Sequence, residues 1–404
     1  MLKDNFFTGQ PLFTQLLKYL PKGSIHSTAR KLKTDHYCKK LTSHYHLVIM
    51  LFSVFQKCNS LRELVTGMMA WQSRLKHLGF NFYPRRSTLS DANVRRTHEF
   101  FEQVYYALYN QHKDKFLPDS RSVNDRLYIM DSSTFELFSD IMGGAGDFSK
   151  NGKRKGGVKA HLVIQAKHLI PEICYLSEAR ENDRILMEKV HLQQRSILVF
   201  DKAYTKHSQW QKWTEQDITW VTRMNKNAVY QVIQQMPISK SQASKGILCD
   251  EYVLLGRGSN PSTEIIPARR IVFYDKSKKR QFTFLTNNER YQPYTVACFY
   301  KKRWAIETKF KSIKQNFQLR YFLGDTANAI KIQLWCALIA DLLIRIVNAV
   351  ANKKNWSYSN LRGLIRMHLA TYVNLIAFLN APEKALGRLI INENSQLSIC
   401  LDST

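Results

Sequence analysis

Two aspartates each come directly after a short apolar run, the pattern of a carboxylate at the end of a buried strand. Asp131 follows the run LYIM at 127–130, and Asp201 follows ILVF at 197–200. A lone aspartate in such a place is more often a turn former or a helix cap. Two of them within one segment of alternating strands and helices favour a shared site, because open sheets carry their ligands at strand ends.

A third acidic residue, Glu307, lies in a segment of helical spacing that is otherwise basic and apolar. At about 100° per residue, one edge of this helix carries Glu307 and three side chains that suit phosphate groups. Those three are Tyr300, Arg303 and Lys314. The adjoining apolar stripe comprises Phe299, Ile306, Phe310, Ile313 and Phe317. A solvated basic helix is the simpler alternative, but it would not gather these polar side chains beside an apolar stripe.

Three carboxylates from two strands and a helix suit Mg²⁺, a hard cation that prefers oxygen ligands. Two such ions about 4 Å apart serve phosphoryl transfer on DNA, because they stabilise the attacking and the leaving oxygens. We therefore expect two Mg²⁺ ions held by Asp131, Asp201 and Glu307, with Mn²⁺ able to substitute and no nucleotide cofactor. The arginine and lysine beside Glu307 would neutralise non-reacting phosphates, and the tyrosine would hydrogen-bond a phosphate oxygen.

The charge of the chain indicates a polyanionic partner. Its 404 residues include 60 Lys and Arg against 32 Asp and Glu, which gives a formal net charge of +28. The basic residues are spread through segments that alternate with apolar runs, which favours nucleic acid over a membrane surface or a ribosome-like role. Seven scattered cysteines without paired spacing are typical of reduced thiols in a cytosolic protein. We expect no membrane span and no signal peptide.

The period of the apolar pattern divides the chain. From residue 1 to about 115 the spacing is helical, and near residue 125 it changes to short apolar runs separated by turn residues. This predicts the order βββαβαβ. The expected strands are 126–131, 158–165, 169–176, 197–200 and 218–223, with helices at 183–192 and 208–215. Residues 225–290 form a β-rich insertion, and helical spacing returns at 294–319 and 328–350.

Arg85 and Arg86 lie in a loop, 78–86, between two helical stretches, of which the second is expected to run as one long helix through 89–106. This arrangement is that of a helix-turn-helix DNA reader or, equally, of a plain helical bundle with a solvated basic face. No spacing within the segment decides between the two.

Three weaker features lie among the expected strands. Lys159 and His161 share one face of the second strand and either approach the site or line a sheet, of which we favour the sheet. The basic turn KNGKRK, which contains Lys153 and Arg154, either grips DNA near the first aspartate or has no binding role. Trp220, in the run ITWV, is expected in the core and not stacked on a flipped base.

The spacing Y-x2-R-x3-E-x6-K at Tyr300, Arg303, Glu307 and Lys314 resembles the signature of the insertion-sequence-4 family of bacterial DDE transposases. The resemblance covers most of the chain and extends to MDSSTFEL, GGVKAHLVIQ, VFDKAY, WVTRMNKNAVY, FTFLTNN and YKKRWAIETKFKSIKQ. One departure is Ala203 in VFDKAY, where family members usually carry glycine. The departure concerns the turn after Asp201, but not Asp201 itself.

The resemblance implies an α/β fold: a ribonuclease H-like, mixed-sheet catalytic core with a β-rich insertion. We therefore expect an all-helical DNA-binding region at 1–115, the catalytic domain at 120–320 with the insertion at about 225–290, and a helical C-terminal region at 321–404.

The implied function is a transposase that cleaves the ends of its insertion sequence and joins the 3′-ends to target DNA. DNA would be the partner, a homodimer would form the synaptic complex, and the protein would act at the nucleoid in the bacterial cytoplasm. Two alternatives are a ribonuclease H-like nuclease or resolvase without strand transfer and a catalytically silent DNA-binding relative.

Overall fold

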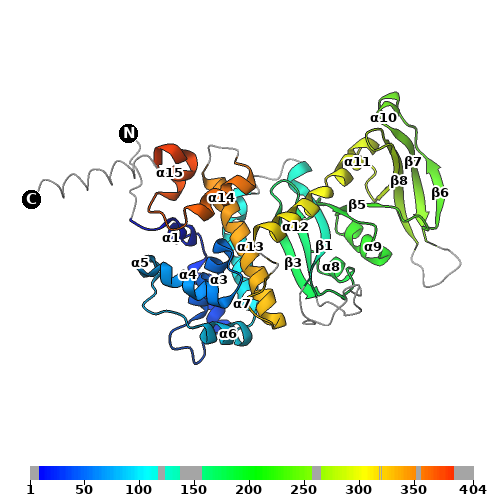
Figure 1. Ribbon diagram of the computed structural model, residues 1–404. Helices are drawn as coiled ribbons and strands as arrows, with labels where there is room; N and C mark the ends of the chain where they lie inside the picture. The colour runs from blue at the N-terminus through cyan, green and yellow to red at the C-terminus, as the bar shows by residue number, and fades with distance from the viewer. Residues whose placement is uncertain are drawn as a thin grey trace, which may run out of the picture. The chain divides into compact units, whose positions relative to one another are not determined.

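The chain forms two compact units in the computed structural model, one of residues 119–312 and one of residues 1–118 with 313–404. Figure 1 labels helices and strands of both units where there is room. The structure describes residues 9–116, 123–136, 157–256, 265–317, 319, 321–351 and 356–385. Lys153 and Arg154 lie outside the described residues.

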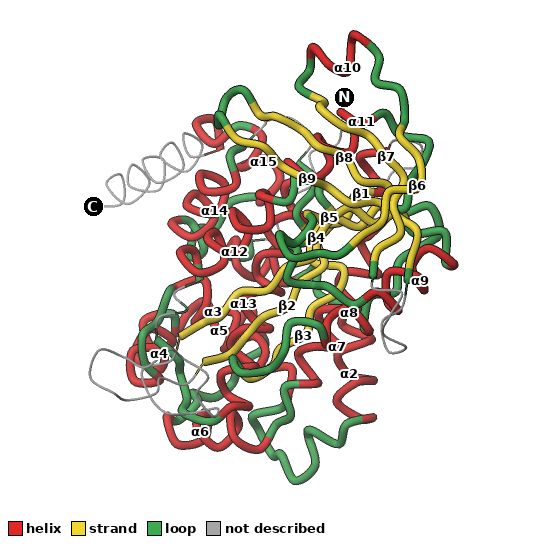
Figure 2. The backbone as a smooth tube through the Cα atoms, turned by 90° about the vertical axis from the view of Figure 1, so that its right-hand side faces the viewer, coloured by secondary structure: helices red, strands yellow, loops and turns green. Residues whose placement is uncertain are grey.

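Residues 119–312 are built on one mixed sheet in the order β3-β2-β1-β4-β5-β9-β8-β7-β6, seen as the twisted yellow strands of Figure 2. The central strands β1, β4 and β5 run parallel, and the other pairings are antiparallel. The strands are β1 Leu127–Glu136, β2 Gly157–Gln165, β3 Ile170–Glu178, β4 Ile197–Phe200, β5 Thr219–Arg223, β6 Tyr230–Gln235, β7 Ile247–Leu255, β8 Ile266–Asp275 and β9 Arg280–Thr286. Such a mixed sheet fits a ribonuclease H-like core.

The predicted order βββαβαβ is present, but the insertion does not form a separate sheet. Its last strand, β9, pairs with β5, so that β6 to β9 extend the sheet of the core. The helices of this unit are α8 Ile185–Glu188, α9 His207–Glu215, α10 Lys240–Ser244 and α11 Pro293–Lys301, and α12 Trp304–Asn316 begins within it.

Alternation along the central strands sends apolar side chains to both faces of the sheet. Met130 and Phe200 pack in one core cluster with residues of α8 and α9, such as Trp213. Leu127 and Val199 pack in a second cluster with residues of α11. The apolar runs of β1 and β4 are therefore packed on both faces of the sheet. This packing fixes the positions of Asp131 and Asp201, which follow the two runs.

The other unit is helical in its described residues, and it takes in both ends of the chain. Its helices are α1 Leu12–Leu17, α2 Lys22–Lys31, α3 Ser43–Gln56, α4 Leu61–Ala70, α5 Gln72–Leu75, α6 Arg86–Arg95, α7 Glu99–His112, α13 Ala327–Val350, α14 Tyr358–Met367 and α15 Leu375–Asn380. The long helix α13 packs against α3 and α7. Near the chain ends, Gln15 Nε2 donates to the carbonyl oxygen of Val373 at 2.7 Å.

The expectation of one long helix through 89–106 is wrong, because the chain turns between α6 and α7. Arg96 has an extended backbone at this turn and is 4% exposed. Its guanidinium donates to the carbonyl oxygens of Thr34 and Leu41 and lies 3.8 Å from Asp35 Oδ1. These tertiary contacts outweigh the helical spacing of the segment.

Across the described ranges, no helix is long and apolar enough to cross a membrane.

Candidate active site

The register of the sheet brings the two aspartates together. Strand β1 pairs with β4 in parallel as far as Met130 opposite Phe200, and Asp131 and Asp201 directly follow these two residues in the chain. Neighbouring strands are about 4.8 Å apart, so the two carboxylates start side by side. Asp201 follows the end of β4 as predicted. The prediction for Asp131 is wrong in one respect, because β1 continues past it to Glu136, held by antiparallel pairing with β2.

The turn after Asp201 accommodates Ala203, where members of the family that the sequence resembles usually carry glycine. Ala203 N donates to Asp201 Oδ1 at 3.1 Å, and Tyr204 N donates to the carbonyl oxygen of Asp201 at 3.1 Å. Ala203 does not have a positive φ, the conformation that would call for glycine. The alanine is therefore compatible with a turn that holds the Asp201 carboxylate.

The segment that carries Glu307 is not the single helix expected over 294–319. Helix α11 ends at Lys301 and α12 begins at Trp304. At the junction Arg303 N donates to the carbonyl oxygen of Tyr300, a bond three residues back that tightens the chain. Tyr300, on the last turn of α11, is 8% exposed and packs on Phe284, with ring centroids 5.0 Å apart. The Arg303 guanidinium carbon lies 6.0 Å from the centroid of the same Tyr300 ring.

Arg303 points from this junction to the carboxylates. Its Nη1 donates to Asp131 Oδ2 at 2.8 Å, and its Nη2 donates to Glu307 Oε1 at 2.6 Å. The side chains of Arg303 and Asp131 are 13% and 18% exposed, whereas that of Glu307 is 38% exposed, so the Asp131 side of the bridge is shielded from water and the Glu307 side is near solvent. The structure thus joins three of the predicted site residues, with the arginine as counter-ion of two acids.

The electrostatics are those of acids crowded into a poorly hydrated place. Burial raises the pKa of Asp131 to about 6, and the carboxylates of Asp201 and Glu307 add to this rise. Arg303 opposes it. Burial also raises the pKa of Tyr300 to about 12, so that its phenol stays neutral.

The three acids suit a divalent cation, because all of them offer carboxylate oxygens. Asp201 and Glu307 are also close enough to Asp131 to raise its pKa. In the part of the chain that the structure describes, no three acidic, histidine or cysteine side chains are close enough to hold a metal ion together. The guanidinium of Arg303 lies between two of the acids and supplies the positive charge that a cation would bring. The three carboxylates thus have the chemistry of metal ligands, and in this structure the Arg303 guanidinium supplies the countercharge for two of them.

A basic cavity of about 660 Å³ lies beside the turn that follows Asp201. Its lining includes the cations Lys202, Arg223 and Lys226 and the ring of Trp210. Sequence reasoning did not find this cavity, because its residues come from a turn, a helix and a strand whose proximity depends on the fold.

The remaining predicted residues lie in several places. Arg85 and Arg86 are exposed at the start of α6, and Lys314 is on the last turn of α12. Trp220 is 1% exposed and donates from Nε1 to Thr214 Oγ1 at 3.0 Å, which confirms its core role.

Lys159 and His161 do more than line the sheet, since both lie close to Asp183, 3.1 Å and 3.9 Å from its Oδ1. Asp183 was not singled out from the sequence, where it appeared as the first residue of an expected helix. Its contact with Ser132, the residue after Asp131, depends on the fold.

Comparison with known proteins agrees with this geometry. The family model described as the transposase DDE domain matches residues 124–343, and a second model, a domain of unknown function, matches residues 8–81. The first match covers more than half of the chain and includes Asp131, Asp201 and Glu307.

The chain is similar to three transposases along much of its length. A putative transposase, y4zB, of Sinorhizobium fredii is 28% identical over 263 residues, 65% of this chain and 71% of that protein. The probable transposase for insertion sequence element IS5377 of Geobacillus stearothermophilus is 28% identical over 192 residues, 47% and 49% of the two chains. The putative transposase for IS4SA of Synechocystis is 22% identical over 272 residues, 65% and 71%.

Among solved structures, a piggyBac transposase synaptic complex with hairpin DNA aligns over 94% of this chain and 83% of that one, at 10% identity and a TM-score of 0.45. Likeness at this level is too weak to carry a conclusion about fold.

The family match and the site geometry lead to one conclusion: the chain belongs to the DDE transposase family, alongside the transposases of bacterial insertion sequences, and it carries out DNA transposition by metal-dependent cutting and joining of strands.

Proposed function

We propose that Asp131, Asp201 and Glu307 are the metal ligands of this transposase and that they hold two Mg²⁺ ions, which Mn²⁺ can replace. The observation that carries the proposal is the parallel pairing of β1 with β4, because both aspartates stand one residue beyond the same register position. Arg303 then links Asp131 to Glu307 on α12. Carboxylate oxygens are the ligands that Mg²⁺ prefers.

The proposed reaction is cut-and-paste transposition, in which the ends of the insertion sequence are cleaved and the 3′-ends are joined to target DNA. When bound, two divalent ions would stabilise the attacking and leaving oxygens of each phosphoryl transfer. The sheet register orients Asp131 and Asp201, and α12 carries Glu307 toward them. Arg303, beside both Asp131 and Glu307, would pair with a non-reacting phosphate through its two-pronged guanidinium.

DNA contacts would come from both units. The net charge of +28 supports an extended interface with phosphates. We propose that the basic cavity beside Asp201 accepts part of the DNA backbone and that the helical region 1–115 binds the element ends. The further contacts proposed are Tyr300, Lys314, Lys153, Arg154, Arg85 and Arg86.

Assembly and setting follow from the reaction. Transposition joins two DNA ends, and one protomer at each end gives a homodimer in the synaptic complex. The Y-x2-R-x3-E-x6-K spacing supports membership of the insertion-sequence-4 family. We propose that the protein acts on DNA in the bacterial cytoplasm, at the nucleoid.

The test is a cleavage and strand-transfer assay with purified protein, Mg²⁺ and labelled DNA that carries the element's own ends. Wild type is compared with Glu307→Gln and with Glu215→Gln, a matched control at an exposed position on α9. DNA binding is measured separately by a mobility shift. We expect Glu307→Gln to bind DNA and to lose cleavage and joining by at least about a thousandfold, a typical loss for an essential catalytic group.

Three results would count against the proposal. Cleavage by Glu307→Gln at the wild-type rate would remove Glu307 from the metal ligands. Cutting without joining by wild type would indicate a nuclease or resolvase. Binding of the ends without cutting, in Mg²⁺ and in Mn²⁺, would indicate a silent DNA-binding relative.

A further inference from the structure

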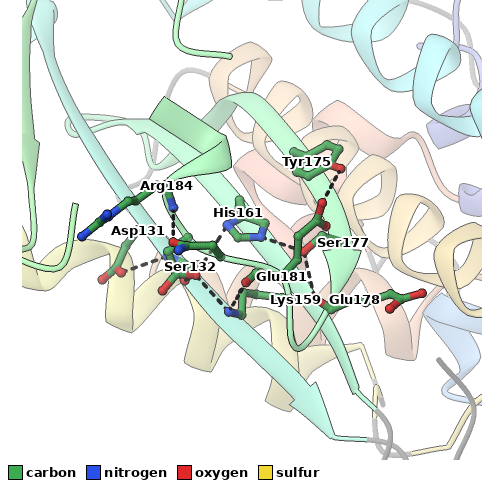
Figure 3. Close-up of polar contacts among 11 residues, drawn as sticks. Asp131, Ser132, Lys159, His161, Tyr175, Ser177, Glu178, Glu181 and Arg184 are labelled. Atoms are coloured by element: carbon green, nitrogen blue, oxygen red, sulfur yellow. Dashed lines mark hydrogen bonds and ion pairs between the residues drawn. The ribbon is translucent and has the colours of Figure 1, made fainter. Parts of the chain in front are cut away.

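We infer that Asp183 is a positioning residue for the Asp131 carboxylate and that it acts through Ser132. This inference rests on the proposed role of Asp131 as a metal ligand. Asp183 lies outside the acidic triad, on the segment that joins β3 to α8. Figure 3 draws the polar contacts of this region, with Asp131, Ser132, Lys159 and His161 labelled.

Ser132 lies between the two carboxylates and contacts both. Its backbone N donates to Asp131 Oδ1 at 2.9 Å, and its Oγ donates to Asp183 Oδ1 at 2.8 Å. The first contact fixes one oxygen of Asp131, while Arg303 holds the other oxygen, Oδ2. The second contact ties the Ser132 side chain to a group outside its own strand. Asp183 thus holds the side chain of the residue whose backbone N holds one oxygen of the Asp131 carboxylate.

Asp183 is itself held from strand β2. Lys159 Nζ lies 3.1 Å from Asp183 Oδ1 and donates to the carbonyl oxygen of Glu181 at 2.9 Å. One lysine therefore fixes both the carboxylate and the backbone of the segment. The Lys159 side chain is 14% exposed and that of Asp183 is 33% exposed, so water screens this pair less than an open surface pair.

His161 completes the support below the same carboxylate. It stands opposite Ser132 in the β1–β2 register and is fully buried. Its Nε2 shares a hydrogen bond of 2.8 Å with Ser177 Oγ, and its Nδ1 lies 3.9 Å from Asp183 Oδ1. Figure 3 shows Ser132, Lys159 and His161 directed toward one another. Since burial lowers the pKa of His161 to about 4, the ring is neutral and Lys159 supplies the countercharge.

The carboxylate of Asp183 also affects a buried phenol in the turn after β4. Tyr204, three residues after Asp201, is 1% exposed. Burial raises the pKa of its phenol, and the carboxylates of Asp131, Asp183 and Asp201 raise it further. Asp183 is therefore within electrostatic reach of residues on both β1 and the turn after β4.

If Asp183 only anchored the segment between β3 and α8, its substitution would have a different effect. A simple anchor affects the free energy of unfolding, whereas a positioning residue affects how tightly the carboxylates bind a cation. Partners that orient metal ligands typically contribute 10–100-fold in metal affinity. Metal affinity and stability must therefore be measured on the same variants.

The experiment uses the full chain without DNA and measures Mn²⁺ binding by electron paramagnetic resonance, with thermal unfolding in EDTA alongside. The variants are Ser132→Ala, Ser132→Thr, Asp183→Ala and the double variant Ser132→Ala/Asp183→Ala. Glu188→Gln is the matched control, because Glu188 is an exposed acid on α8 that pairs with Lys206 at 2.6 Å.

We expect Ser132→Ala and Asp183→Ala each to weaken Mn²⁺ binding about tenfold. The double variant should be no weaker than the stronger single variant, because both remove one interaction. Ser132→Thr should restore binding to within about threefold of wild type, since it keeps the hydroxyl donor. Glu188→Gln should bind as wild type does.

Unchanged Mn²⁺ binding in the folded single variants, or additive losses in the double variant, would overturn the inference. Asp131→Asn separates this failure from that of the proposed function. If Asp131→Asn binds Mn²⁺ normally, the metal-ligand role itself is wrong. If Asp131→Asn loses binding and Ser132→Ala does not, the role of Asp183 alone is wrong.

Discussion

Two arginines in the catalytic unit hold carboxylates in opposite ways. In the insertion, Arg269 pairs with Asp250 through two parallel hydrogen bonds of 2.7 Å, and the two side chains are 6% and 4% exposed. At the active site, Arg303 gives one hydrogen bond to Asp131 and another to Glu307, whose side chain is 38% exposed. One arginine is committed to a single buried acid, and the other is shared between two acids near solvent.

Arg269 has backbone partners in addition to Asp250. Arg269 Nη1 also donates to the carbonyl oxygens of Asn288, Glu289 and Tyr291, in the loop that leads to α11. Arg269 therefore clamps the insertion to the segment that carries the Glu307 helix. A buried pair of this kind is costly to break, whereas a shared pair near solvent can exchange partners. The difference separates a structural arginine from one suited to meet substrate.

The largest effect is expected at the clamp. Arg269→Met leaves Asp250 buried without its partner and should lower the free energy of unfolding by about 3–5 kcal/mol. Arg195→Met is the matched control, because Arg195 faces Asp217 at 3.9 Å with both side chains more than two-thirds exposed. Such an exposed pair contributes about 1 kcal/mol at most. Equal losses in urea unfolding of the two variants would contradict the structural role of Arg269.

A smaller change in the free energy of unfolding is expected at Asp131, where substitution should stabilise the protein instead of destabilising it. Its pKa is raised to about 6 from 3.8, so the folded protein binds this proton more tightly than the unfolded chain. Ionising Asp131 therefore lowers the free energy of unfolding. This loss is absent below pH 3.8, grows as the pH rises through 6, and reaches about 3 kcal/mol at most. Asp131→Asn should therefore stabilise the metal-free protein near pH 7.5 and have little effect near pH 4.

Thermal unfolding in EDTA at both pH values measures this difference. Subtracting the wild-type midpoint from that of the variant removes the titration of the other groups. A variant less stable than wild type at pH 7.5 would mean that Arg303 holds the Asp131 carboxylate more strongly than burial opposes it.

The smallest effect is expected at Arg303, and it concerns the affinity for Mn²⁺. Arg303→Met removes the positive charge between Asp131 and Glu307, so Mn²⁺ should bind the DNA-free protein about threefold to tenfold more tightly, roughly 1 kcal/mol. Lys301→Met, an exposed lysine at the end of α11, is the control for the loss of one charge. If both variants change Mn²⁺ affinity equally, Arg303 does not compete with cations at the site.

The sequence predicts the central strands well because their signals are local. The run ILVF at 197–200 is apolar and bounded by polar residues, and it appears as β4. The run VKAHLVIQ at 158–165 begins with alternating apolar and polar residues after two glycines, and it appears as β2. The extension of β1 to Glu136 was missed, because residues 132–136 include polar side chains that pairing with β2, and not hydrophobicity, keeps in the strand.

The site was predicted in its acids but not in its contacts. Strand ends and helical spacing pointed to Asp131, Asp201 and Glu307. The helical wheel assumed an unbroken helix, and no Pro or Gly between Tyr300 and Glu307 signals the break. Only the fold shows that Arg303 turns to the carboxylates. The contact of Asp183 with Ser132 likewise joins residues 51 positions apart.

The most direct test of the metal site replaces Mg²⁺ with Fe²⁺ and adds ascorbate and peroxide, so that hydroxyl radicals cut the protein backbone beside the bound ion. We predict fragments whose ends map near residues 131, 201 and 307, and their loss in Glu307→Gln. Cleavage that clusters elsewhere in the chain, or that is unchanged in Glu307→Gln, would contradict the assignment of Asp131, Asp201 and Glu307 as the metal ligands.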